Sequence, residues 1–347
     1  MSKSAGTLGA HPAWIWGARP ATRRLAVIAV VLGIVAVMSL LIGRYPNPGF
    51  IAPDRLASDD LAQRIVFNLR LPRILTALAM GMSLAAAGAV FQQIFANPLV
   101  EPGFLGVSQG AAFGASLAIV FWGSTAWLVQ GSAALFALAG LGLSYLLARR
   151  AQFGGSVLRL VFAGIAVSAL FSAGVGALKY TADPLSQLPE ITFWLLGGLA
   201  SVTWPQLWSI VPVVVVSLFV MYRMRWRLNL LSLEDATAFS LGATPGRERA
   251  LLLGAAVAAT AAVVSVCGMV GWIGLIVPHI ARRLFGADAR DAVPAALLIG
   301  GLFGVLCDDI ARTLLPGEIP IGILTSFIGA LFFFAIFMTY GHRGGQQ

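Results

Sequence analysis

Residues 74–100 read ILTALAMGMSLAAAGAVFQQIFANPLV and contain no charged side chain. A helix needs about 20 mostly apolar residues to cross a bilayer, so this stretch is long enough for one crossing. The whole chain has the same character: 59% of its 347 residues are hydrophobic, 11% are charged, and the mean hydropathy is +0.87. Soluble domains carry about 25% charged residues. The sequence therefore predicts an all-α integral membrane protein.

Charge-free runs elsewhere in the chain predict further crossings. The run 25–43 is too long for the apolar part of a cleaved signal, so we expect it to remain as a first span. The run 250–281 has arginines near both ends but is too short for two straight spans, so one helix there should be short or broken. The remaining expectations are two spans in 102–148 with a turn near 122–127, a short helix at 191–199, and spans at 160–178, 204–222, 292–307 and 319–340. The total is about ten transmembrane helices, some of them short or broken.

An even number of spans places both termini on one side of the membrane. The loops on that side carry most of the lysine and arginine residues, and the positive-inside rule makes it the cytoplasm. We therefore expect cytoplasmic tails at 1–24 and 341–347, a single membrane domain at 25–340, and a long cytoplasmic loop at 225–249. Cys267 and Cys307 lie in or beside apolar runs and are not paired in a CxxC motif, so no disulfide or metal site is expected.

Several arginines depart from this rule, because they fall on the predicted outer side. Arg64, Arg70 and Arg73 lie in RIVFNLRLPRIL at 64–75, and Arg312 precedes PGEIPIG. Long basic side chains often anchor a helix end at the lipid headgroups. Arginine also binds carboxylates through two parallel hydrogen bonds, which suits the docking of a partner protein. The sequence alone does not decide between an anchor at the headgroups and a docking site. Asp308 and Asp309 precede Arg312 at helical spacing and are expected to pair with it.

Three long stretches, in this order, carry a resemblance to a known family. They are LRLPRILTALAMGMSLAAAGAVFQQIFANPLVEPGFLGVSQGAAFGA at 69–115, GWIGLIVPHIARRLFGADAR at 271–290 and DDIARTLLPGEIPIGILTSFIGA at 308–330. They resemble the permease subunits of FecCD-type, or type II, ATP-binding-cassette (ABC) importers for iron complexes and cobalamin. The resemblance covers about residues 65–340, which is nearly the whole chain.

The resemblance implies a permease of the bacterial cytoplasmic (inner) membrane. Two copies would form a homodimeric pathway for an iron complex, either a ferric siderophore or haem, with cobalamin less expected, and a soluble binding protein would deliver this cargo. The movement would be ATP-driven alternating access. The chain has no GxxxxGK[ST] phosphate-binding loop, so it is not expected to be an enzyme or to hold a cofactor. ATP and Mg would bind to two separate ATPase subunits.

The resemblance also assigns roles to residues. In the family, arginines matching Arg70, Arg73 and Arg312 accept glutamates of the binding protein, although this chain has EIPIG where the family has ELPIG. Asn97 and Leu99, with Gly154, Gly155 and Ser156, match the cytoplasmic gate. Read without the family, FANPLVEPGFLG at 95–106 is a tight connecting turn in which prolines and glycines prevent a regular helix. Lys179 and Tyr180 are candidates for contact with an anionic chelate. The alternative, which we favour for Lys179, is that it only ends a membrane span.

The loop 225–249 is the expected contact with the ATPase. Leu233, Ala236, Thr237 and Ser240 fall at helical spacing, and Gly242 is placed to end that helix. An amphipathic helix lying on the membrane surface would show the same pattern. The resemblance favours ATPase coupling and gives the candidate residues Glu234, Asp235, Ala236, Leu241, Gly242 and Ala243.

Two other classes of function fit the sequence less well. An ion-coupled secondary transporter without an ATPase would need protonatable residues along its spans, and few occur here. A membrane receptor or scaffold that transports nothing would have no use for the spans broken by proline and glycine. Small residues such as Gly81 and Gly88 are expected to allow close helix packing.

Overall fold

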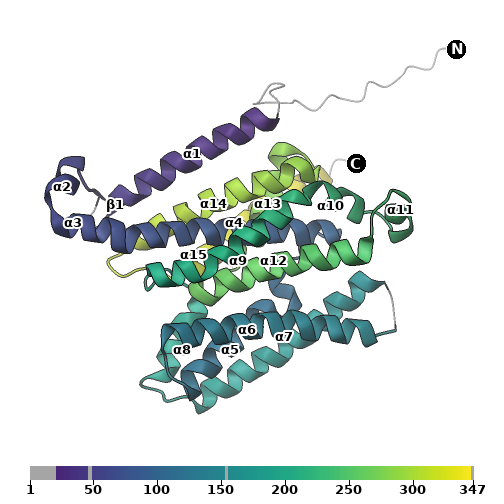
Figure 1. The fold of residues 1–347 in the computed structure, drawn as a ribbon, viewed down its shortest axis with the longest axis horizontal. Coiled ribbons are helices and arrows are strands. Elements are labelled where there is room, and N and C mark those ends of the chain that lie inside the picture. Colours follow the sequence, from purple (N-terminus) through teal and green to yellow (C-terminus); the bar gives the residue numbers. More distant parts are fainter. Residues whose placement is uncertain (1–20, 46–48, 153–154, 345–347) are drawn as a thin grey trace.

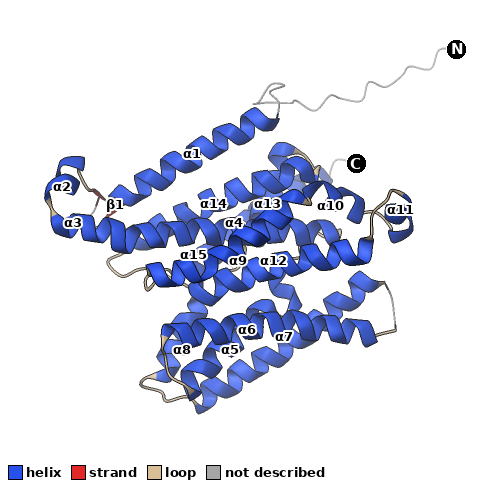
Figure 2. Cartoon of the chain, in the orientation of Figure 1, coloured by secondary structure: helices blue, strands red, loops and turns tan. Residues whose placement is uncertain are grey.

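The computed structural model describes residues 21–45, 49–152 and 155–344, and this part of the chain is almost wholly helical (Figures 1 and 2). The first half contains α1 (Ala21–Leu41), β1 (Ile42–Gly43), β2 (Gly49–Phe50), α2 (Pro53–Ser58), α3 (Asp60–Arg64), the π-helical η1 (Ile65–Arg70), α4 (Leu71–Ile94), the 3-10 helix η2 (Pro102–Leu105), α5 (Val107–Phe121), α6 (Ala126–Arg150) and α7 (Ser156–Thr181). The second half contains α8 (Gln187–Leu196), α9 (Trp204–Arg223), α10 (Arg225–Leu231), α11 (Asp235–Ser240), α12 (Pro245–Cys267), α13 (Ile273–Phe285), α14 (Ala289–Thr313) and α15 (Ile321–Gly344). The two short strands pair antiparallel.

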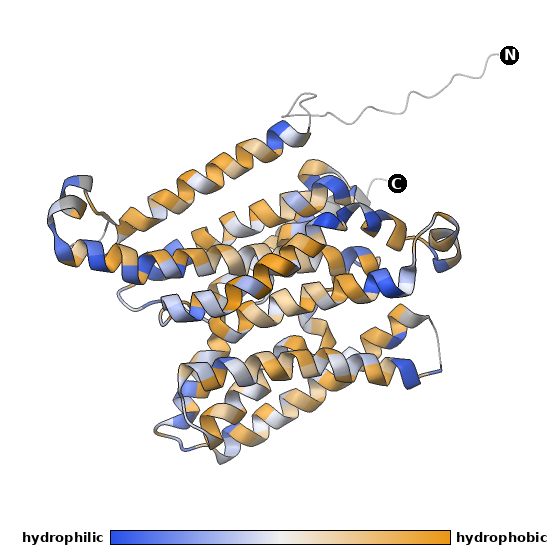
Figure 3. Ribbon diagram, in the orientation of Figure 1, coloured by the Kyte–Doolittle hydropathy of each residue, from blue (hydrophilic) through white to orange (hydrophobic). Residues whose placement is uncertain are grey.

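Seven helices among the described residues are long and apolar enough to cross a membrane. They are α1, the continuous stretch Asp60–Ile94, α6, α7, α9, α12 and α14. Two shorter apolar helices, α5 and the first part of α15, and the 13-residue α13 lie among them. Figure 3 shows that the helices are hydrophobic over their middle parts and hydrophilic mainly toward two opposite ends of the molecule. The all-α membrane fold expected from the sequence is confirmed, and its parts agree with about ten crossings.

The two ends of the molecule carry different elements. One end, called the α11 end, holds α10 and α11, the beginning of α1 and the end of α15 (Figure 1). The opposite end, called the α3 end, holds α2, α3 and β1. The two described chain ends thus lie at the same end of the molecule.

The core of the fold is α4, which packs against α9, α12, α13 and α14. A Cβ atom placed on Gly81 would lie 2.0 Å from the carbonyl oxygen of Gly300, and one on Gly88 would lie 1.9 Å from that of Gly274. Only glycine allows such approach of two backbones. The predicted close packing at Gly81 and Gly88 is confirmed. A second group, α5, α6 and α7, packs together beneath this core in Figure 1.

The region 250–281 contains one full helix and one short helix, as expected. α12 ends at Cys267, Gly268 adopts a left-handed φ of +70°, and α13 begins only at Ile273. Because α13 has 13 residues, it covers about 20 Å at 1.5 Å per residue, well short of a bilayer core. Residues 268–272 provide part of the missing length as irregular chain.

Two more helix breaks meet this one. The N–H of Gly198, after α8, donates to the carbonyl of Cys267 at 2.8 Å, and the N–H of Ile321, which begins α15, donates to Gly197 at 3.0 Å. A Cβ atom on Gly322 would lie 2.4 Å from the carbonyl oxygen of Leu196. The breaks α8–α9, α12–α13 and α14–α15 therefore form one contact point, called the junction here (196–198, 267–272 and 320–322).

Candidate functional site: a cavity at the junction of broken helices

Two cavities adjoin the junction. The first, of about 270 Å³, is lined mainly by the segments 101–104 and 269–271 and by the start of α5. The second, of about 710 Å³, is lined mainly by the end of α8, the segment 269–272 and the start of α15. Both are lined by Glu101, Phe104, Met269 and Gly271. Irregular backbone at membrane depth is tolerated where it is buried in protein or lines a cavity, and transporters use such broken helices at their substrate sites. The junction therefore marks the strongest candidate site in the described chain.

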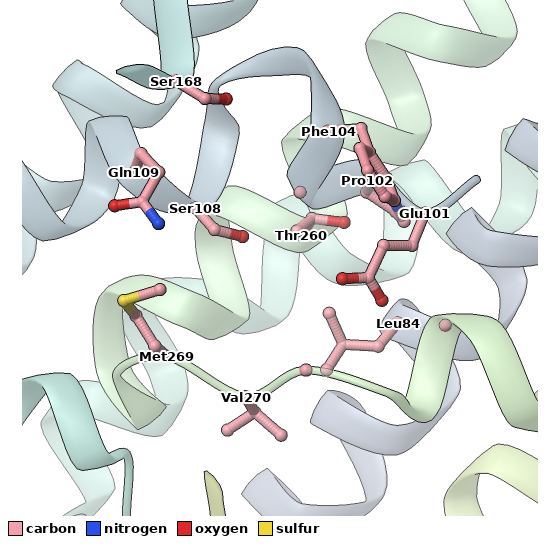
Figure 4. A pocket seen from close by; sticks show the side chains of 13 residues that line it. Leu84, Glu101, Pro102, Phe104, Ser108, Gln109, Ser168, Thr260, Met269 and Val270 are labelled. Carbon is pink, nitrogen blue, oxygen red and sulfur yellow. The ribbon is translucent and has the colours of Figure 1, made fainter. Parts of the chain in front are cut away.

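Polar side chains face the first cavity from several elements (Figure 4). Ser108 and Gln109 come from α5, Ser168 from α7 and Thr260 from α12. Leu84, Met269 and Val270 supply apolar wall. A cavity with a mostly apolar wall and a few convergent polar groups is typical of a small-molecule site.

Glu101 is the only acidic residue that lines these two cavities. Its carboxylate accepts a hydrogen bond from the backbone N–H of Trp272, which begins the turn into α13. The segment between α4 and α5 is thereby tied to the α12–α13 break. Through this carboxylate, the position of the segment between α4 and α5 depends on the position of the α12–α13 break.

Trp272 is held from two sides. Its φ of +71° is left-handed, which is an unfavourable conformation for a residue with a large side chain. Its indole ring occupies the space beside Gly329 of α15, where a Cβ would lie 2.4 Å from the ring, and it meets Phe333 edge to face at 5.8 Å. The strained backbone is thus fixed by Glu101, and the ring by α15. Strained positions of this kind concentrate at functional sites.

The segment 95–106 reaches the cavity because its sequence turns it back into the bundle. It contains two prolines, and Gly106 ends η2 with a φ of +79°. The Ser144 hydroxyl of α6 donates to the carbonyl of Leu105 at 3.0 Å, and a Cβ on Gly164 of α7 would lie 2.4 Å from the carbonyl of Phe104. The expectation that this stretch forms no regular α-helix is confirmed. It packs against α6 and α7 and begins α5 deep in the bundle.

The predicted gate residues lie within this segment and at the start of α7. Asn97 accepts a hydrogen bond from the N–H of Leu99 at 2.9 Å, and the Leu99 side chain is exposed. Gly155 precedes α7 in an extended conformation. Gly154 lies outside the described residues, as does the side chain of Ser156. The gate assignment stays a prediction.

The predicted coupling loop forms two short helices, α10 and α11, at the α11 end (Figure 1). Glu234 precedes α11, Asp235 and Ala236 lie in its first turn, and Gly242 follows it with a left-handed φ of +80°. Leu241 is exposed, whereas Ala243 is buried. The helix and its glycine end agree with the spacing in the sequence. Phe239, which we did not predict, is 70% exposed and adds to an apolar tip with Leu233 and Leu241.

The base of this loop is braced by charged groups. Asp235 pairs with Arg249 at 2.5 Å, and Arg227 pairs with Glu248 at 3.2 Å, which ties the loop to the first turns of α12. Asn229 of α10 donates to Asp288, the N-cap of α14, at 2.7 Å. The N–H of Arg290 and the Asn229 amide together hold the pKa of Asp288 below its usual value, because both donate to its ionised form. These contacts would therefore transmit a movement of the loop to α12 and α14.

The three predicted docking arginines are buried at the α3 end. Arg70 donates to the carbonyl of Leu40 at 3.0 Å. Arg73 pairs with Asp308 at 2.8 Å and with Glu318 at 2.7 Å. Arg312 donates to the backbone of Ser39 and Ile42 and pairs with Asp309 and, at 3.6 Å, with Asp308. The expected pairing of Arg312 with both aspartates is confirmed.

These contacts balance the charge of the arginine cluster. Arg73 and Arg312 pair with three carboxylates, those of Asp308, Asp309 and Glu318, and Arg70 beside them contributes the third positive charge. Glu318 is the most exposed of the three, with 45% of its side chain accessible, whereas Asp308 is fully buried. A partner's glutamate could reach Arg73 only by displacing Glu318. Docking by these arginines stays a prediction.

Lys179 and Tyr180 lie in the last turn of α7, before the turn that leads into α8. Tyr180 is 92% exposed. Neither residue lines the two cavities at the junction. Their contact with a substrate also stays a prediction.

Sequence reasoning missed Glu101 and Trp272, which the structure brings together. One signal was available, because Glu101 is the only acidic residue between Asp60 and Asp183. Isolated carboxylates in apolar sequence are costly and tend to be functional. The sequence carries no comparable signal for Trp272, because its strain lies in a backbone φ angle that only the structure shows.

Comparison with known proteins agrees with this architecture. The model of the FecCD transport family matches residues 25–339. The molybdate import system permease protein MolB of Haemophilus influenzae is 41% identical over 328 residues, which cover 92% of this chain and 96% of MolB. A probable iron chelatin transport system permease protein of Helicobacter pylori is 40% identical, covering 92% of this chain and 99% of its own. The hemin transport system permease protein HmuU of Yersinia pestis is 35% identical, covering 89% and 93%.

A solved structure has the same fold. It is described as an inward-facing conformation of a metal-chelate type ABC transporter, and it aligns with a TM-score of 0.85 and 38% identity over 92% of this chain and 99% of that one.

Proposed function

The chain belongs to the FecCD transport family, whose relatives here are permease subunits of ABC importers, and from this premise we propose that it moves an iron chelate inward across a bacterial cytoplasmic membrane. The observation that carries the proposal is the junction, where three helix breaks meet beside two cavities that are both lined by Glu101. A pathway that opens alternately to two sides needs segments that can change their contacts with one another.

The transport complex in this proposal has five parts. Two copies of the chain form the pathway between them, two ATPase subunits bind at the α11 end, and one binding protein docks at the α3 end. The exposed apolar tip of Leu233, Phe239 and Leu241 supports the ATPase contact, because exposed apolar patches of this kind mark protein interaction sites. ATP hydrolysis would take place in the ATPase, and the bracing by Asp235 and Arg249 would pass the movement to α12.

The cargo is a ferric siderophore or haem in this proposal, with cobalamin less expected. A second candidate is molybdate, because the 41% identical relative is a molybdate permease. Cavities lined by neutral polar groups and one carboxylate do not by themselves select between a chelate and an oxyanion.

The test is uptake into proteoliposomes that contain the chain and its ATPase. The binding protein is added outside, with ferric siderophores, haem, cobalamin and molybdate as separate cargoes, with and without ATP inside. Uptake that requires both ATP and binding protein supports the importer and identifies its cargo. Uptake without ATP would instead favour an ion-coupled carrier.

The matched control is an ATPase whose catalytic glutamate is replaced by glutamine. It should bind ATP and assemble with the chain, yet abolish uptake. If uptake continued at the wild-type rate with this ATPase, the proposed energy source would be wrong.

A further inference from the structure

A third cavity, of about 660 Å³, lies away from the junction, between α6, α7 and α12 at their α11 ends. It shares no lining residue with either cavity at the junction. Its floor is the end of α4 at Ile94 and Phe95. The proposed transport pathway does not use this space, so it requires a separate explanation.

The deep part of the cavity is apolar. Leu138, Leu141 and Leu160 line it on one side, and Leu253 lines it on the α12 side. A Cβ atom placed on Gly142 of α6 or on Gly254 of α12 would meet nothing within 4 Å, so both glycines border open space. Cavities with apolar walls stay dry and bind apolar groups. In a membrane protein, the apolar group at hand is a lipid acyl chain.

The mouth of the cavity is basic. Arg149 comes from the last turn of α6, Arg159 from the first turn of α7 and Arg249 from the first turn of α12. Asp235 supplies the only carboxylate that lines the cavity, so the lining carries a net positive charge. All three arginines stand at helix ends, where an apolar span meets the membrane surface.

These arginines retain unused donors. The Nε atoms of Arg159 and Arg249 are buried and have no hydrogen-bond partner in the described chain. Within the described chain, Arg159 donates only to the carbonyl of Ala151, at 2.7 Å. Arg149 lies over the ring of Tyr145 at 5.9 Å and makes no hydrogen bond to a described residue. A phosphate group offers several acceptor oxygens and would satisfy these donors.

An apolar cavity with a basic mouth at a helix end has the two-part chemistry of an anionic phospholipid. A free phosphate would leave the apolar wall unused, and an acidic side chain of the ATPase would also fill only the mouth. We propose that this cavity binds an anionic glycerophospholipid, with one acyl chain against α6 and α12 and its phosphate held by Arg149, Arg159 and Arg249.

The site touches the coupling loop through Arg249. This arginine also pairs with Asp235 at 2.5 Å, in the first turn of α11. A lipid phosphate beside Arg249 shares its guanidinium with Asp235 and so loosens the brace between α11 and α12. Lipid occupancy thereby alters how firmly the loop is held.

Native mass spectrometry of the chain assembled with its ATPase tests the proposal. The complex is titrated with phosphatidylglycerol and with phosphatidylcholine of identical acyl chains. We expect tighter binding of phosphatidylglycerol, and a loss of about tenfold in Arg149→Gln, which is the effect of one charge-assisted hydrogen bond. Gly142→Leu fills the open space and should weaken binding of the lipid without changing the charge.

Two matched controls lie on the same helix. Arg150→Gln changes the neighbouring exposed arginine, which does not line the cavity, and Gly131→Leu adds the same side chain at an exposed glycine outside it. Both controls should bind phosphatidylglycerol as the wild type does.

Equal binding of the two lipids, or wild-type binding by Arg149→Gln and Gly142→Leu, would overturn the proposal. Displacement of the lipid by glycerol phosphate at equal concentration would show a site for a soluble anion instead. Absence of lipid from the assembled complex, but not from the isolated chain, would show that the ATPase occupies the mouth. None of these readouts depends on uptake, so they remain separate from the test of the proposed transport.

Discussion

The Nε atom of Arg73 lies 2.8 Å from the Oδ1 atom of Asp308, and this pair joins α4 to α14 at a point where the Asp308 side chain is fully buried. A buried pair costs much desolvation energy when it forms, and removal of one partner leaves an uncompensated charge. Arg73 therefore has a structural role in this arrangement, whatever partner it meets.

Arg73→Ala should destabilise the protein by about 3–5 kcal/mol, since Asp308 would lose its closest ionic partner. The measurement is thermal unfolding of the purified protein in detergent. Arg64→Ala, at an exposed arginine of the same region, is the control and should unfold at the wild-type temperature. Equal stability of the two variants would show that Asp308 does not depend on Arg73. A loss of binding-protein affinity in Arg73 variants is thus no proof of docking.

Glu318→Gln offers a cleaner test of docking at Arg73. Glu318 covers Arg73 from the solvent side, and its neutral replacement should weaken this contact. If the binding protein places a glutamate on Arg73, its affinity should rise by up to about fivefold, the effect of one partly exposed ion pair. Surface plasmon resonance against the purified binding protein measures the change. Asp54→Asn, at an exposed carboxylate of α2, should leave the affinity unchanged, and a similar rise in both variants would point to general electrostatics.

Glu101→Ala should lower the rate of uptake, because the N–H of Trp272 loses its acceptor and the α12–α13 break loses its tie to the segment 95–106. Glu101→Gln keeps an acceptor oxygen at the same position and should retain most of the rate. Uptake in proteoliposomes at saturating binding protein gives both values. If glutamine impaired uptake as strongly as alanine, the negative charge would matter and not the hydrogen bond.

Gly81→Ala should destabilise the protein by about 1–3 kcal/mol, the usual range for overpacking. The added methyl group would lie 2.0 Å from the backbone oxygen of Gly300, and a backbone cannot rotate away as a side chain can. Gly131→Ala, where the new methyl meets nothing within 4 Å, should have no such cost and supplies the comparison. The measurement is again thermal unfolding in detergent. Equal unfolding temperatures for the two variants would show that the contact between Gly81 and Gly300 tolerates a methyl group.

Gly242→Ala should uncouple ATP hydrolysis from uptake. Gly242 has a φ of +80°, and a residue with a Cβ atom pays about 1 kcal/mol or more there, so the end of α11 would shift. The readout is the ratio of transported cargo to hydrolysed ATP. Gly246→Ala, at a glycine with open space in the next turn, controls for the methyl group itself. An unchanged ratio in Gly242→Ala would move the coupling site to another loop.

The helices could be predicted from the sequence because their cause is local. Runs of apolar residues between charges gave the spans, and the glycines and proline of 268–278 gave the short α13. The helix α11 followed from the spacing of Leu233, Ala236 and Ser240 and from Gly242 at its end. Pairing of Arg312 with Asp308 and Asp309 was predictable for the same reason, since all three lie within two turns of one helix.

The partners of the other site residues could not be predicted, because they come from distant parts of the chain. Arg73 and Glu318 are 245 positions apart, and the contact between Glu101 and Trp272 depends on how two irregular segments return into the bundle. Periodicity carries no information on such contacts. Arg70 and Arg312 were expected on the outer side, where they anchor a helix end or dock a partner, and their contacts with the carbonyl groups at the end of α1 and in β1 could not be foreseen from the spacing.

The shortness of α13 has a consequence for how the protein is made. A segment of 13 residues that contains Pro278 and ends in Arg282 and Arg283 is too short and too basic to enter lipid by itself. It needs protein neighbours to stay in the bilayer, and the structure supplies them in α4, which precedes it in the chain, and α14, which follows it. We therefore expect α13 to enter the bilayer as part of a helix bundle and not as an independent span, and truncation of the chain before α14 to weaken its insertion.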